Sequence, residues 1–142
     1  MDKRMKVLFL CTGNSCRSQM AEGFARFLKS DFIDAYSAGT APKGLDPRAV
    51  KVMGEAGVDI MQQISKHLDE FKNIEFDYVV TLCDHAHENC PLFPGKTKVI
   101  HVGFDDPPRL ALNATAEEEI LNQYRRIRDE IKHFVLTFSN KL

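Results

Sequence analysis

The stretch that decides the fold is Lys6-Val-Leu-Phe-Leu-Cys11, followed directly by Thr12-Gly-Asn-Ser-Cys-Arg-Ser18. The first part is a short apolar run that ends in turn residues, which predicts a buried strand running into a tight loop. Beyond the loop, apolar residues recur at helical spacing from about Ser18 to Lys29. A strand, a tight loop and a helix in this order are typical of α/β proteins with a parallel sheet.

The rest of the chain repeats this alternation. Further strands are expected around Ala35 to Ser37, Tyr78 to Cys83 and Val99 to Val102. Asp46-Pro47 predicts a helix start with Asp46 as N-cap, and Thr115-Ala-Glu-Glu118 is a capping box that opens a long helix with an apolar stripe. We therefore predict the α/β class, with residues 1–142 forming a single domain. Its small parallel sheet should have about four strands, flanked by helices on both faces.

Composition limits the classes of function. The chain has 142 residues, 44% of them hydrophobic and 27% charged, with a net charge of −1, so bulk electrostatics predict neither a nucleic acid nor a membrane partner. No apolar run approaches the roughly 20 residues that span a bilayer, and the N-terminus lacks a signal peptide. We expect a cytoplasmic protein whose four cysteines start reduced. Nothing in the pattern requires a second subunit, so a monomer is expected.

The loop after the first strand has the composition of an oxyanion site. Its Cys-x5-Arg spacing puts Cys11 at the end of a strand and Arg17 at the start of a helix, where free N–H groups and the helix dipole favour anions. Arg17 adds a planar donor matched to two oxygens of a tetrahedral oxyanion, and the same field favours the thiolate of Cys11. We expect the whole loop to bind substrate: Thr12, Gly13, Asn14, Ser15, Cys16, Arg17 and Ser18. The alternative is a buried strand-end Cys11 beside a solvated Arg17.

Residues 7–23, from Val7 to Gly23, resemble the start of the low-molecular-weight protein tyrosine phosphatase superfamily. Within it they are most similar to the thioredoxin-coupled arsenate reductases. The resemblance continues nearly to the end of the chain, through Tyr36-Ser-Ala-Gly39, Val79-Val-Thr-Leu-Cys83, Cys90-Pro91, Gly103-Phe-Asp-Asp-Pro107 and Arg126-Ile-Arg-Asp-Glu-Ile131. The loop is specific for the superfamily, whereas the pair of cysteines is specific for the reductases.

This resemblance implies an arsenate reductase in which Cys11 attacks arsenic and Arg17 holds the oxyanion. Asp106, directly before Pro107, corresponds to the general acid of the family. Cys83 and then Cys90 pass the oxidation outward as disulfides. The implied partners are arsenate, with phosphate or another oxyanion as an alternative ligand, and an external thiol reductant, thioredoxin or a glutaredoxin-type protein. No bound cofactor is expected.

Cys83 and Cys90 are seven residues apart. If the intervening residues are helical, the rise between them is about 10 Å, whereas a disulfide needs Cα atoms about 4.4–6.8 Å apart. A Cys83–Cys90 disulfide would therefore require the segment to unwind.

Two other functions stay open at this level. A phosphatase would use the same loop, Arg17 and Asp106, although the phosphatases usually carry tyrosines after Asp-Pro, where this chain has Pro108-Arg109-Leu110. A zinc module could draw on Cys83, His85, His87 and Cys90, but histidines two apart diverge on a helix.

In some members of the superfamily Glu22 and Ser37 join an Asp to bind a monovalent cation. Lys66 takes the place of that Asp here, so we predict that its ammonium neutralises Glu22 and that no potassium binds.

Overall fold

The structure is a computed structural model that describes residues 4–84, 86, 90, 93 and 95–139. The segment between Cys83 and Cys90 is described only at residues 84 and 86, so the condition that it is helical falls largely outside the described residues. None of the described helices is long and apolar enough to cross a membrane.

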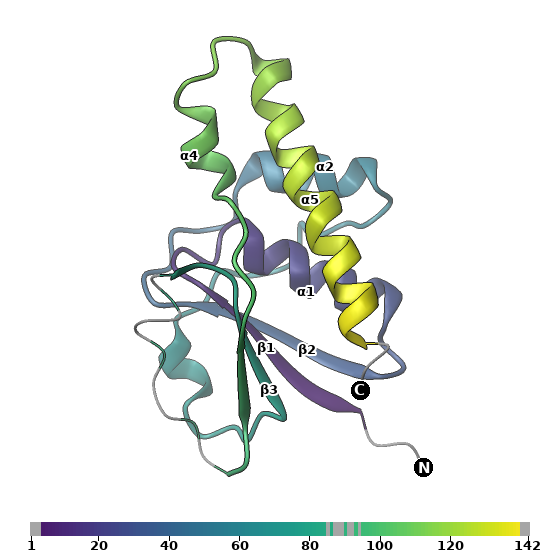
Figure 1. The fold of residues 1–142 in the computed structure, drawn as a ribbon, viewed down its shortest axis with the longest axis vertical. Coiled ribbons are helices and arrows are strands. Elements are labelled where there is room, and N and C mark those ends of the chain that lie inside the picture. The colour runs from purple at the N-terminus through teal and green to yellow at the C-terminus, as the bar shows by residue number, and fades with distance from the viewer. Residues whose placement is uncertain (1–3, 85, 87–89, 91–92, 94, 140–142) are drawn as a thin grey trace.

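Four parallel strands form one sheet, which confirms the predicted fold class. The strands are β1 (Met5–Cys11), β2 (Ile33–Gly39), β3 (Tyr78–Thr81) and β4 (Lys98–His101), arranged in the order β2-β1-β3-β4 (Figure 1). In this register Cys11 lies opposite Gly39, and Leu10 lies opposite Thr81. Because all the strands are parallel, their carboxyl ends meet at one edge, where β1 runs into the Cys-x5-Arg loop.

The α-helices lie on one face of the sheet, and a short 3-10 helix lies on the other. The α-helices are α1 (Arg17–Leu28), α2 (Pro47–Glu55) and α5 (Glu117–Ser139), with a short α4 (Pro107–Ala111) ahead of α5 (Figure 1). Side chains alternate along a strand: Ser37 contacts Glu22 of α1, whereas Tyr36 packs edge-to-face on Phe71. Phe71 belongs to the 3-10 helix η1 (Leu68–Phe71), so helical residues cover both faces.

The core lies between the sheet and the long helix. Leu8, Phe9 and Leu10 of β1 are fully buried, because β1 has a strand on each side and a layer on each face. On α5 the buried stripe includes Tyr124 and Ile127, as its periodicity predicts.

Local signals predicted the starts of the helices with mixed success. Asp46 does cap α2, its carboxylate accepting a hydrogen bond from the N–H of Arg48. The expected capping box is wrong: α5 begins at Glu117, and its first backbone hydrogen bond runs from Ile120 to Ala116 rather than to Thr115.

Candidate active site

Cys11 lies at the end of β1 with its sulfur 2.9 Å from the hydroxyl oxygen of Ser18. The amide of Asn14 donates to that same oxygen at 2.7 Å. Because the oxygen already accepts from Asn14, the hydrogen of the Ser18 hydroxyl is available to the sulfur. A donor aimed at the sulfur stabilises negative charge on it, as a nucleophilic thiolate requires.

Asn14 holds the loop in shape. It is fully buried and has a φ of 44°, in the left-handed region that asparagine tolerates better than most residues. Its side-chain oxygen accepts from the N–H of Lys66 at 2.7 Å and from the amide of Gln19 at 3.1 Å. Sequence reasoning missed Gln19, whose only signal was a polar residue on the inner side of the first helical turn.

The carbonyl groups of the loop point outward. Those of Thr12, Gly13 and Ser15 accept hydrogen bonds from the N–H groups of Ala41, Lys43 and Asp46, at 2.8, 2.9 and 2.9 Å. In the described part of the chain, no hydrogen bond is found for the N–H groups of residues 12–16. A loop whose carbonyls are held outward and whose N–H groups are free is a nest suited to an anion.

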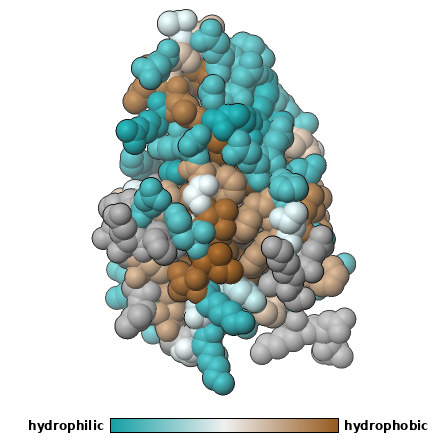
Figure 2. All heavy atoms as spheres, in the orientation of Figure 1, coloured by the Kyte–Doolittle hydropathy of each residue, from teal (hydrophilic) through white to brown (hydrophobic). Residues whose placement is uncertain are grey.

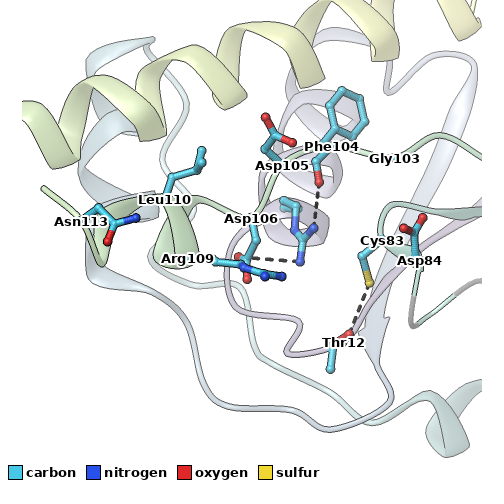
Figure 3. A pocket seen from close by; sticks show the side chains of 11 residues that line it. Thr12, Cys83, Asp84, Gly103, Phe104, Asp105, Asp106, Arg109, Leu110 and Asn113 are labelled. Atoms are coloured by element: carbon cyan, nitrogen blue, oxygen red, sulfur yellow. Dashed lines mark hydrogen bonds and ion pairs between the residues drawn. The ribbon is translucent and has the colours of Figure 1, made fainter.

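Arg17 and Asp106 meet at a cavity of about 630 Å³ beside the loop (Figure 3). One guanidinium nitrogen of Arg17 donates to the carbonyl of Phe104 at 2.9 Å, and the other lies 3.7 Å from the carboxylate of Asp106. Asp105 instead pairs with Arg126 at 3.2 Å. The structure therefore brings Asp106, rather than its neighbour, to the predicted oxyanion site.

Cys83 lines the same cavity. Its sulfur lies 3.3 Å from the hydroxyl of Thr12, the residue after Cys11 (Figure 3), and accepts from the N–H of Ala86 at 3.4 Å. Adjacent parallel strands explain this contact, since Cys11 ends β1 and Cys83 follows β3. The sequence predicted that both cysteines lie at carboxyl ends of strands, and the structure brings them to the same loop.

The other two cysteines differ in their surroundings. Cys90 is half-buried, and burial raises the pKa of its thiol. Cys16 is fully enclosed in the loop, where burial first and the charge of Asp46 second raise its pKa well above the usual value. A thiol held neutral in this way is a poor nucleophile, which separates Cys16 from the cysteines expected to form the relay. The structure describes all four cysteines and joins none of them in a disulfide.

Glu22 is an almost fully buried carboxylate behind the loop. It accepts a hydrogen bond from Ser37, and Arg26 lies 3.3 Å away. The ammonium of Lys66 lies 3.9 Å from the same carboxylate, as the replacement of the expected Asp predicts. The absence of potassium stays a prediction. The zinc alternative depends on His85 and His87, which lie outside the described residues.

Known proteins are similar to this chain in sequence and in fold. Residues 6–142 match the family described as Low molecular weight phosphotyrosine protein phosphatase. A protein named Arsenate reductase from Shouchella clausii is 50% identical over 133 residues, covering 92% of this chain and 91% of that protein. Another of that name, from Halalkalibacterium halodurans, is 45% identical over 139 residues, covering 98% and 97%.

Solved structures agree. "An arsenate reductase in oxidized state" superimposes with a TM-score of 0.78 at 30% identity, covering 96% of this chain and 98% of that one. A low molecular weight protein tyrosine phosphatase from T. tengcongensis gives 0.76 at 27% identity, covering 97% and 99%. The chain therefore belongs to the low molecular weight phosphotyrosine protein phosphatase family, in which the relatives just described from Shouchella clausii and Halalkalibacterium halodurans are arsenate reductases.

Proposed function

We propose that this protein reduces arsenate to arsenite with Cys11 as the nucleophile, and that Cys83 and Cys90 carry the oxidation away. The observation that carries the proposal is the position of Cys83, whose sulfur lies 3.3 Å from the Thr12 hydroxyl at the edge of the oxyanion loop. Phosphoryl transfer needs no second sulfur there, whereas a two-electron reduction does. Relatives from two organisms, 45% and 50% identical, are named for this activity.

In the first step arsenate occupies the loop, with its oxygens on the free N–H groups and on Arg17. The Cys11 thiolate attacks arsenic, and one oxygen leaves as water with a proton supplied by Asp106. The 3.7 Å separation between Arg17 and Asp106 supports these roles, because it puts the acid within reach of an anion held by Arg17. The product is a covalent bond between the Cys11 sulfur and pentavalent arsenic.

In the second step the Cys83 thiolate attacks the Cys11 sulfur. The electron pair of the sulfur–arsenic bond passes to arsenic, which leaves as trivalent arsenite, and a Cys11–Cys83 disulfide forms. Cys90 then attacks Cys83, which releases the Cys11 thiolate for another cycle. The half-buried position of Cys90 supports a role at the outer end of this relay, within reach of a protein partner.

The resulting Cys83–Cys90 disulfide needs two electrons from outside the chain. We infer that a dithiol protein, thioredoxin or a glutaredoxin-type protein, supplies them and that no cofactor is bound. We further infer that residues 1–142 act as a single domain, as a monomer and in the cytoplasm.

Hydrolysis of phosphate esters is the second candidate activity. The loop, Arg17 and Asp106 would serve phosphoryl transfer as well, since phosphate and arsenate share shape and charge. A Cys11 phosphoenzyme would form in place of the arsenic adduct, and it would involve neither Cys83 nor Cys90.

The test is arsenate-dependent NADPH oxidation in the presence of thioredoxin and thioredoxin reductase. We expect turnover by the wild type and none by Cys83→Ser or Cys90→Ser, while both variants keep any hydrolysis of p-nitrophenyl phosphate. The retained hydrolysis is the internal control, because it shows that the oxyanion loop and Arg17 stay intact in both variants. Phosphatase activity without arsenate turnover in the wild type would refute the proposal and favour hydrolysis of phosphate esters as the function.

A further inference from the structure

Arg109 lines the cavity beside the oxyanion loop, together with Arg17, Cys83 and Asp106. It belongs to α4, the short helix that begins directly after Asp106. Figure 3 shows its side chain among those that line the cavity. The mechanism proposed above gives this residue no role.

The charges around the cavity single out Arg109. The three carboxylates that line the cavity each have a cationic neighbour: Asp84 lies 3.1 Å from His101, Asp105 lies 3.2 Å from Arg126, and Asp106 lies 3.7 Å from Arg17. The side chain of Arg109 forms no hydrogen bond or ion pair with any residue that the structure describes. An exposed guanidinium without a partner, on the wall of an anion site, is available to the ligand itself.

A tetrahedral oxyanion presents one position to this wall. With three oxygens on the N–H groups of the loop and on Arg17, the fourth would point out of the loop, where Asp106 and Arg109 line the cavity. In arsenate or phosphate this fourth position is an oxygen, whereas in an ester it carries an organic group. A guanidinium on the outer wall therefore discriminates between the two, because it forms a charge-assisted hydrogen bond only with the unesterified anion.

We propose that Arg109 is a specificity residue that binds the outward oxygen of a free inorganic oxyanion and so selects it over phosphate or arsenate esters. This inference rests on the proposed function, because selection of a free oxyanion matters to an arsenate reductase. The anion binding that it predicts is measured without turnover. The hydrogen bond pairs a charged donor with an anion in a cavity open to solvent, so we expect an effect of about tenfold in affinity.

The test compares two anions that differ only at the fourth position. Inorganic phosphate carries an oxygen there and methylphosphonate a methyl group. Their dissociation constants are measured by NMR titration of the reduced protein, at a pH at which both are dianions. Arg109→Gln should weaken phosphate binding about tenfold and methylphosphonate binding less than twofold, and Arg109→Lys should keep part of the phosphate affinity.

Lys96→Gln is the matched control, because it removes the same charge from an exposed turn just before β4, at the opposite edge of the sheet. It should leave both affinities unchanged. Equal weakening of the two anions by Arg109→Gln would overturn the proposal, because the effect would then be one of general charge. No weakening of either would also overturn it.

The two proposals fail in different ways. A wild type that binds phosphate with the predicted selectivity but does not turn over arsenate would refute the proposed function and leave the role of Arg109 intact. Arsenate turnover with an unchanged phosphate affinity in Arg109→Gln would refute the role of Arg109 alone. A wild type that binds neither anion would refute both.

Discussion

Replacing Gly39 by alanine tests whether the end of β2 supports the oxyanion loop. A Cβ atom at Gly39 would lie within 3.0 Å of the carbonyl oxygen of Thr12 and 2.9 Å from the backbone nitrogen of Asn14. Both are backbone atoms, which cannot rotate away as the end of a side chain does. The Thr12 carbonyl is also held by the N–H of Ala41 at 2.8 Å, so either the loop or β2 has to move.

The expected cost follows from this geometry. An extra methyl group in a closely packed region destabilises a protein by about 1–3 kcal/mol. We expect the upper end for Gly39→Ala, because the obstructing atoms are backbone atoms held by hydrogen bonds. Displacing the loop also moves the N–H groups that face the anion, so affinity for phosphate should fall about tenfold or more, since a misplacement near 1 Å costs roughly a hundredfold in activity.

Gly54→Ala is the matched control. Gly54 lies within α2, and a Cβ atom there would have nothing within 4 Å. Alanine in a helix is about 0.5–1 kcal/mol more stable than glycine, so this variant should gain stability and bind phosphate like the wild type. The same chemical change should thus shift the free energy of unfolding in opposite directions at the two positions.

Urea unfolding and NMR titration with phosphate provide the two measurements. Two-state transitions with equal slopes allow the midpoints to be compared directly. If Gly39→Ala unfolds within about 0.5 kcal/mol of the wild type and binds phosphate equally well, the close packing of β2 on the loop is refuted. A loss of stability with unchanged affinity would mean that β2 moves while the loop keeps its shape.

Three further predictions follow from buried groups. Tyr124→Phe removes a 2.7 Å hydrogen bond to Asp46 and should cost about 1–2 kcal/mol in urea unfolding. Burial raises the pKa of Tyr124, so the wild type should lose stability as the pH rises above about 10, where the unfolded tyrosine ionises, and the variant should lose less. Because the ammonium of Lys66 lies near Glu22, the melting temperature should be equal in potassium and choline chloride at one ionic strength; a rise specific to potassium would contradict this. Burial raises the pKa of Cys90, so its alkylation by iodoacetamide, followed by mass spectrometry, should accelerate from pH 7 to 9, while Cys16 stays unmodified in the folded protein.

Much of the fold could be predicted from local patterns. The apolar run of β1, the Asp46-Pro47 helix start and the stripe on α5 each depend on residues close together in the sequence, and the structure has all three. Periodicity failed at the end of α1, where Phe27 falls on the apolar face but is 57% exposed. A pattern shows which residues share a face, but not how far along the helix a packing partner extends.

The candidate site divides in the same way. The oxyanion loop runs from Cys11 at the end of a strand to Arg17 and Ser18 at the start of a helix, so its Cys-x5-Arg spacing alone predicted a site for an anion. The choice of general acid depended on the family resemblance, which favoured Asp106 over Asp105. The structure places Asp106 3.7 Å from Arg17, whereas Asp105 pairs with Arg126.

The sequence by itself determined the elements, the parallel α/β class and the chemistry of the loop, because each depends on the spacing of neighbouring residues. Only the tertiary structure decided that Cys83 lies at Thr12, that Gly39 packs on the loop and that Arg109 faces the cavity. These contacts join residues tens of positions apart. They follow from the strand order β2-β1-β3-β4, which brings distant segments together at one edge of the sheet and which no local pattern specifies.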